Sequence, residues 1–330
     1  MMKMLLNQSS FVPAARKPLP GLPPRIEAPH HPRSQGFTLT ELLVIIAVVA
    51  VLMACQLSAS SGSKPKSKGA QCLNNVRQLS LAWLMYAEDN HDYILASADD
   101  GNGTLPYQPI NPSNYNRGNN YAWTWSKMDF SGSNPYNTDP AADIMLRPMW
   151  KYIQNASAYK CPGDPSTVSV NGASVPRVRS YSMNWFLGGF GENSSDPIDA
   201  SFTFYTRLTD LADPVRSPGT AHTFLFIEER EDAINWGDFE TDMTGYPVGS
   251  SRAAPAAYEW NEDLPGAYHD RAGGISFCDG HAELHKWLDA STLPRLAGEF
   301  LSGGKGDGST FTAPYSVDVA WLQNATVRSH

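Results

Sequence analysis

The sequence predicts an α+β protein, in which an N-terminal transmembrane helix precedes a globular domain with an antiparallel β-sheet and long loops. Helical spacing of apolar residues is found before residue 90, whereas apolar or alternating runs of strand length follow only after residue 177. Helices first and strands later is the order typical of the α+β class. With 330 residues, of which 42% are hydrophobic, the chain can bury a sizeable core.

Residues 1–36 form a proline-rich leader that carries five Lys or Arg residues and one acid. This composition predicts a disordered segment held on the cytoplasmic side of a membrane. The rest of the chain has 20 basic and 32 acidic residues, a net charge of −12. Such an acidic region offers no electrostatic basis for binding nucleic acid.

Residues 37–57 are almost uniformly apolar and contain one charged residue, Glu41. A helix of this length, at about 1.5 Å per residue, matches a hydrocarbon core of about 30 Å. We therefore expect a single-pass inner-membrane protein. Residues 58–70 are rich in Ser, Gly and Lys and predict a linker or a loosened helix. Residues 71–330 then form a globular domain outside the cytoplasm.

Glu41 requires an explanation, because a charge inside a membrane span is costly and is usually functional. Cleavage between Gly36 and Phe37 would create an α-ammonium group four residues before Glu41, about one helical turn away. That charge can pair with Glu41 of the same chain or of a neighbouring subunit.

The run Gly36-Phe37-Thr38-Leu39-Thr40-Glu41-Leu42-Leu43, followed by an apolar stretch, resembles the processing site of type IV prepilins and type II secretion pseudopilins. The resemblance implies a pilin-like helix, cleavage after Gly36 by a prepilin peptidase, N-methylation of Phe37, and a role for Glu41 in subunit registry. It also implies a structural subunit that assembles with other pilin or pseudopilin subunits into a type IV pilus or a type II secretion filament.

An alternative interpretation starts from Leu52-Met53-Ala54-Cys55, which resembles a bacterial lipobox with Cys55 as the lipidated residue. The chain would then be a surface enzyme or a carbohydrate-binding protein, held by a lipid or by an uncleaved signal anchor. No nucleophile elbow, phosphate-binding loop, zinc-protease helix or dinucleotide fingerprint is present. The sequence therefore predicts no enzymatic activity.

Within the globular domain, residues 71–90 predict an amphipathic helix that packs on the sheet. Its apolar face is formed by Cys72, Val76, Leu79, Trp83 and Tyr86. Strand candidates follow at residues 178–187, 221–228 and 274–287. Residues 90–140, rich in Asn, Gly, Pro and Tyr, predict long loops and short strands.

Asp279-Gly280 predicts a hairpin with a two-residue type I′ turn. In that register Cys278 faces His281, and a core face collects Ile275, Phe277, Ala282 and Leu284. The opposite face would carry Ser276, Cys278, His281, Glu283 and His285. Together with His269 and Asp270, this second face is either the solvated side of the hairpin or a metal or acid–base cluster.

His269, nine residues, and then Asp279-Gly280 resemble the H-X9-DG domain of large pilin-like proteins, here at residues 269–287. Further segments match that pattern in order: residues 72–75 with Leu79, 86–90, 160–164 and 180–184. The resemblance implies an architecture and an export pathway rather than a chemistry.

The four cysteines show neither paired CxxC motifs nor the Cys/His spacing of zinc sites, so the sequence predicts no structural zinc and no other cofactor. Cys72 and Cys161 would lie where disulfides persist. We expect either a bond that fastens the helix to the sheet domain or two buried free thiols.

Residues 228–242 carry seven acids and one arginine. A solvated acidic loop is the simpler interpretation. A calcium site is the alternative, because calcium prefers several oxygen ligands on one loop.

Overall fold

The computed structural model describes residues 39–40, 42–44, 46, 64–98, 121–124, 127–188, 201–202, 204–296 and 311–329. The chain divides into two units, Met1–Ser58 and Ala59–His330. In the first unit, the described residues of the predicted span 37–57 are helical, and the others lie outside the described residues. Among the residues that the structure describes, no helix combines the length and the apolar character that crossing a membrane requires.

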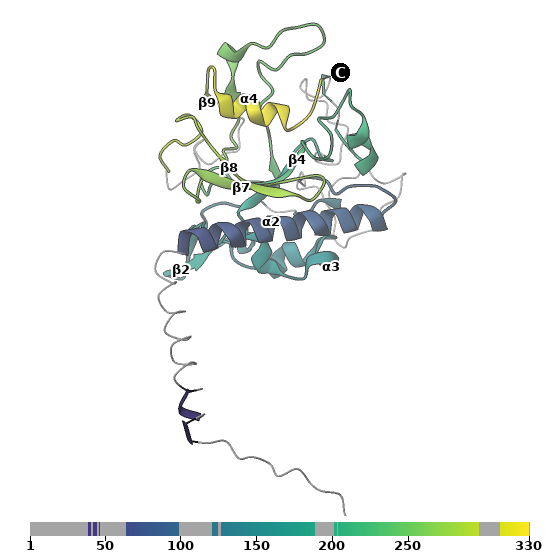
Figure 1. Ribbon diagram of the computed structural model, residues 1–330. Coiled ribbons are helices and arrows are strands. Elements are labelled where there is room, and N and C mark those ends of the chain that lie inside the picture. Colours follow the sequence, from purple (N-terminus) through teal and green to yellow (C-terminus); the bar gives the residue numbers. More distant parts are fainter. Residues whose placement is uncertain are drawn as a thin grey trace, which may run out of the picture. The chain divides into compact units, whose positions relative to one another are not determined.

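The second unit is an α+β domain with one main sheet (Figure 1). In the described residues its α-helices are α2 (Lys64–Asp89), α3 (Trp150–Ile153) and α4 (Val317–Asn324). The strands are β1 (Thr167–Val170), β2 (Ala173–Pro176), β3 (Tyr181–Asn184), β4 (Phe224–Glu228), β5 (Asp238–Phe239), β6 (Glu259–Trp260), β7 (Ala272–Phe277), β8 (Ala282–Lys286) and β9 (Phe311–Thr312). The short 3₁₀ helices are η2 (Pro135–Asn137), η3 (Pro140–Ala142), η4 (Ile144–Leu146), η5 (Ala156–Tyr159), η6 (Leu208–Ala212) and η7 (Pro255–Ala257).

The main sheet has the strand order β5-β3-β4-β7-β8. The pairs β3–β4, β4–β7 and β7–β8 are antiparallel, and β3–β5 is parallel. The expected antiparallel sheet is therefore confirmed except at the β5 edge. The strand candidates at 178–187, 221–228 and 274–287 each contain observed strands.

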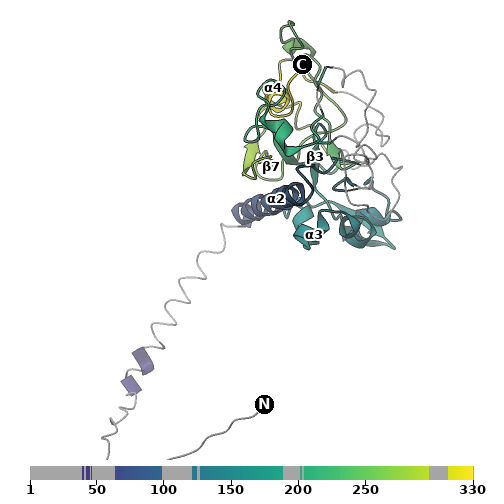
Figure 2. The same ribbon diagram turned by 90° about the vertical axis from the view of Figure 1, so that its right-hand side faces the viewer.

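Helix α2 covers one face of this sheet and α4 the other, as two views show (Figures 1 and 2). All five predicted apolar residues of α2 are at most 1% exposed, which confirms its amphipathic face. This face lies in one hydrophobic core with Tyr181 and Phe226, whereas Leu322 of α4 lies in a second core with Ile275. The sheet is thus buried between two apolar layers, which explains why β4 reads as the continuous apolar run FLFI.

Helix α2 begins at Lys64, so residues 64–70, predicted as part of a linker or a loosened helix, are helical in the structure. Pro65 is the second residue of α2, where a backbone N–H would have no intrahelical acceptor. A Cβ at Gly69 would lie 3.0 Å from Leu284 Cδ1, so this glycine lets α2 approach β8 closely. Residues 58–63 lie outside the described residues.

The β7–β8 hairpin has a different turn from the one predicted. Ser276 pairs with Ala282, and the Phe277 N–H donates to the His281 carbonyl at 2.9 Å. Gly280 has a φ of 91°, whereas Asp279 is not among the described residues with positive φ. The connection is therefore a three-residue loop with a left-handed glycine, and not a type I′ turn.

This one-residue shift in register changes which side chains share a face. Ala282 joins the core beside α2, whereas Ile275 and Phe277 belong to the core beside α4. Leu284 is 36% exposed. The predicted common core face of these residues was wrong, because the turn type sets the register of a hairpin.

The acidic segment 228–242 is largely buried, so the solvated loop was also a wrong interpretation. Asp232 is fully buried and pairs with Arg230 at 2.5 Å. Arg179 donates to the carbonyl oxygens of Asn235 and Trp236, and Arg177 donates to that of Glu231. Buried arginines from outside the segment thus satisfy three of its backbone carbonyl oxygens, which helps to fold it into the domain.

Candidate functional site

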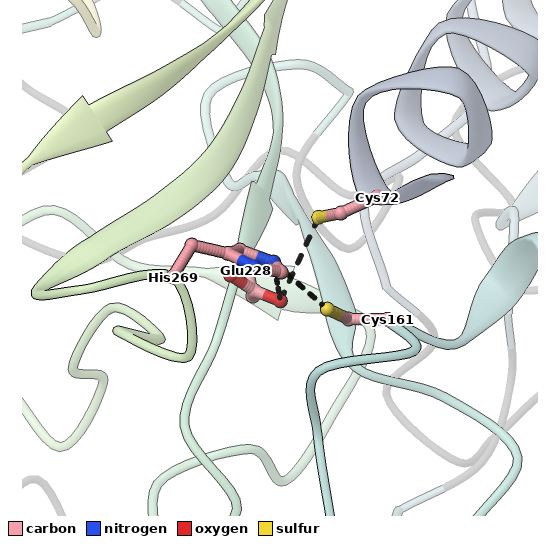
Figure 3. A group of neighbouring side chains, drawn as sticks. All are labelled: Cys72, Cys161, Glu228 and His269. Carbon is pink, nitrogen blue, oxygen red and sulfur yellow. Dashed lines mark hydrogen bonds and ion pairs between the residues drawn. The ribbon is translucent and has the colours of Figure 1, made fainter. Parts of the chain in front are cut away.

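Four side chains from distant parts of the chain converge inside the second unit: Cys72, Cys161, Glu228 and His269 (Figure 3). Their donor atoms all lie within 4.8 Å of one another. Cys72 lies on α2, Cys161 follows η5, Glu228 is the last residue of β4, and His269 precedes β7. Among the residues that the structure describes, this is the one group of three or more such side chains close enough to share a metal ion.

Local structure aims each side chain into this cluster. Cys72 belongs to the buried face of α2. Glu228 pairs with Tyr181 at the end of β4. His269 precedes a tight turn in which Asp270 and Arg271 both have positive φ, and the backbones of His269 and Ala272 exchange hydrogen bonds of 3.1 and 3.2 Å. This is the type I′ geometry, found here rather than at Asp279-Gly280.

The contacts within the cluster are direct. Cys161 Sγ lies 3.2 Å from His269 Nε2. The Cys72 thiol donates to Glu228 Oε1 at 3.7 Å, and the same oxygen lies 3.6 Å from His269 Nε2. The side chains of Glu228 and His269 are 0% and 4% exposed. The Glu228 carboxyl group, the His269 imidazole and two thiols thus share one buried site.

Electrostatics couple these groups. Burial lowers the pKa of His269, but hydrogen bonds with Cys161 and Glu228 outweigh burial and raise that pKa to about 10. Contact with the Cys72 thiol, together with burial, raises the pKa of Cys161. The arrangement therefore favours a protonated His269 and a neutral Cys161 thiol.

Backbone and phenol donors surround the cluster. The Gly163 N–H donates to Cys161 Sγ at 3.1 Å, and the Tyr181 hydroxyl donates to Cys72 Sγ at 3.2 Å. The Gly274 N–H donates to Glu228 Oε2 at 3.1 Å, which leaves Oε1 turned toward the thiols and the imidazole. These donors stabilise negative charge on the sulfur and oxygen atoms.

The predicted cysteine pair is close together, and both sulfurs are free thiols in this structure. Whether they bond to each other stays a prediction. Cys278 is also a buried free thiol and lies outside the cluster. Cys55 lies outside the described residues.

The side chains of His269, Asp270 and His281, predicted as members of a possible metal or acid–base cluster, do not converge. The Asp270 side chain is 96% exposed and lies 3.9 Å from Lys286 Nζ. Asp279 and His281 pair with each other at 2.6 Å in the exposed hairpin loop. Of these side chains, only that of His269 lies in the buried cluster, because Asp270 is part of the exposed type I′ turn.

The acidic segment 228–242 contributes one residue, Glu228, to the cluster, and its other described acids form no group of three that could share an ion. The calcium hypothesis thus gains no support from the geometry of these described residues.

That Glu228 lies next to Cys72, Cys161 and His269 in the fold was not predicted from the sequence. A signal was present, however, because three of the four residues lie in the segments that resemble the H-X9-DG pattern. The Tyr181 hydroxyl comes from another such segment, and the Asn75 side-chain amide donates to the Lys160 carbonyl at 3.0 Å. These segments, scattered along the chain, meet around one buried site.

The processing residues Gly36, Phe37 and Glu41 lie outside the described residues. Comparison with known proteins addresses this part of the chain. Residues 31–54 match the prokaryotic N-terminal methylation motif. No solved structure is significantly similar to the chain.

Two curated relatives match about a quarter of the chain. Type II secretion system core protein G of Escherichia coli (strain K12) is 31% identical over 88 residues, which are 26% of this chain and 59% of the relative. The protein of the same name from Dickeya chrysanthemi is 31% identical over 86 residues, 25% of this chain and 55% of the relative. The chain thus spans little more than half the length of these relatives. The chain thus carries a prokaryotic N-terminal methylation motif and is similar, over about a quarter of its length, to type II secretion system core protein G.

Proposed function

We propose that this chain is a structural subunit of a type II secretion pseudopilus or a related type IV filament. A prepilin peptidase removes residues 1–36, and the new N-terminal Phe37 is methylated. Residues 37–57 hold the subunit in the inner membrane, and residues 71–330 lie outside the cytoplasm. Assembly brings the Phe37 ammonium group to the Glu41 carboxylate of the same or a neighbouring subunit.

The observation that carries this proposal is the methylation motif at residues 31–54, which encloses Gly36, Phe37 and Glu41. The similarity to core protein G supports the type II secretion branch.

The second unit supplies the exported domain in this proposal, with residues 269–287 as an H-X9-DG region. The contacts among the matching segments support it, since Asn75, Lys160, Tyr181 and His269 all lie at or beside one buried cluster. A tethered enzyme is less well supported, because the side chains suggested for catalysis separate in the structure.

Replacing Glu41 tests the assembly step. We expect Glu41→Ala to insert into the membrane and to be cleaved, but to lose co-assembly with wild-type subunits, because the registry charge is absent. Thr38→Ala is the matched control, since it changes a neighbouring polar residue without changing charge. Cross-linking of purified filaments gives the readout. Normal incorporation of Glu41→Ala would contradict the proposed assembly mechanism.

A further inference from the structure

We propose that Cys72, Cys161, Glu228 and His269 form a zinc site that fastens α2 to the main sheet (Figure 3). The proposal starts from composition: two sulfurs, one imidazole nitrogen and one carboxylate oxygen are the ligand types of tetrahedral zinc sites. It is independent of the proposed function, because all four residues lie in the unit Ala59–His330.

The distances fit such a site. With zinc bonds of about 2.3 Å to sulfur and about 2.0 Å to nitrogen or oxygen, ligand atoms of a tetrahedron lie about 3.3–3.8 Å apart. The observed separations are 3.2 Å for Cys161 Sγ and His269 Nε2, 3.6 Å for His269 Nε2 and Glu228 Oε1, and 3.7 Å for Glu228 Oε1 and Cys72 Sγ. All six separations are at most 4.8 Å, so side-chain shifts of up to about 1 Å would bring the four ligand atoms to tetrahedral distances.

Two glycines hold space open around the ligands. A Cβ at Gly274 would lie 2.6 Å from Cys72 Sγ, and a Cβ at Gly163 would lie 2.9 Å from His269 Cε1. The same two glycines donate their N–H groups to Glu228 and Cys161. Each glycine thus both leaves room for one ligand and orients another, as residues surrounding a metal site commonly do.

Charge and ligand type select the ion. Two thiolates and a carboxylate are three anionic ligands, which suit a divalent cation in a buried site. Thiolate and imidazole favour zinc over magnesium or calcium, which prefer oxygen. Binding releases the two thiol protons and any imidazolium proton to solvent and involves no change of oxidation state.

A surface pocket borders the site at Cys161. This pocket has a volume of about 660 Å³, and its walls also include Asn75 and Lys160. Bound zinc would connect α2, the segment after η5, the end of β4 and the turn before β7. It would therefore cross-link the helix to the sheet, which is the role predicted above for a disulfide between Cys72 and Cys161.

The zinc site and a Cys72–Cys161 disulfide exclude each other, because both use the same two sulfurs. The two states differ in mass and in metal content. A disulfide lowers the mass by two hydrogens and removes both thiolate ligands, whereas zinc leaves both sulfurs unoxidised, as thiolates, and adds one ion per chain.

The test uses the full-length chain purified in detergent, with and without reductant, followed by metal analysis. We expect one zinc per chain in both preparations. Cobalt replacing zinc should give the visible bands of a tetrahedral site and a thiolate charge-transfer band. Cys161→Ser and His269→Gln should lose these bands. The matched controls Cys278→Ala and His281→Gln, at a buried thiol and an imidazole outside the cluster, should keep them.

Two outcomes would overturn the proposal. One is reduced wild-type protein that binds neither zinc nor cobalt, a result that does not depend on whether any variant folds. The other is metal-free protein, purified without reductant, in which peptide mapping finds Cys72 bonded to Cys161. Neither outcome bears on processing at Gly36, so this proposal and the proposed function can fail separately.

Discussion

Cys161 Sγ lies 3.2 Å from His269 Nε2, although the two residues are 108 positions apart in the chain. His269 begins the spacing that resembles the H-X9-DG pattern, and Cys161 lies in a lysine-cysteine-proline-glycine-aspartate segment that also resembles it. Their contact gives these two matching segments a common structural purpose, which is to complete one buried cluster between α2 and the sheet.

Zinc should raise the stability of the domain if this cluster binds it. A ligand that binds only the folded state adds about 2.7 kcal/mol at a free concentration of 100 Kd. We expect a chelator to lower the thermal midpoint of wild-type protein and zinc to restore it. His269→Gln should show no zinc-dependent shift, whereas His281→Gln should behave as wild type does. Equal shifts in both variants would place the binding elsewhere.

Gly274→Ala should destabilise the domain by about 1–3 kcal/mol, because the new methyl group overpacks the site against Cys72 Sγ. Chemical denaturation measures this cost. In the double variant with Cys72→Ala, the new methyl group occupies the space that the sulfur has left. The loss of stability in the double variant should therefore be smaller than the sum of the losses in the two single variants. Strict additivity would show that the clash with Cys72 is not the cause.

Stability should fall as the pH rises from about 4.5 to about 8, in part because of Glu229. Burial is the main cause that raises the pKa of Glu229 from 4.5 to about 8. Over this interval the folded chain holds a proton that the unfolded chain has released. The free energy of unfolding therefore decreases with pH, by at most about 1.4 kcal/mol per unit for one group.

Glu229→Gln removes this contribution, so its unfolding free energy should decline less steeply over the same pH interval. The decline should not vanish, because burial also raises the pKa of Asp238, to about 7. Denaturant titrations at several pH values compare the two proteins. Parallel pH profiles would show that Glu229 does not hold a proton in the folded state.

The buried face of helix α2 could be predicted from the sequence, because a repeat of apolar residues every three to four positions fits one face of a helix. The spacing of Cys72, Val76, Leu79, Trp83 and Tyr86 predicted the buried face of α2, because only one side of a helix carries that pattern. The register of the hairpin could not be predicted in this way, since Asp279-Gly280 fits more than one turn type and one residue of register exchanges the faces of β8. Local sequence does not distinguish these alternatives.

The cluster could not be predicted from spacing, because its four residues come from separate segments and have no fixed interval. The burial of the acidic segment 228–242 could not be predicted for a related reason. Its charges suggest solvent, but Arg177 and Arg179, about 50 residues earlier in the chain, pack against it and satisfy its carbonyl oxygens. Both features depend on tertiary contacts that a linear pattern does not contain.

The central claim, that the chain is processed as a pseudopilin, is tested most directly by the mass of the mature N-terminal peptide isolated from membranes. The account predicts a chain that begins with N-methylated Phe37 and has Glu41 as its fifth residue. A mature chain that begins at Met1, or at a lipidated Cys55, would contradict it.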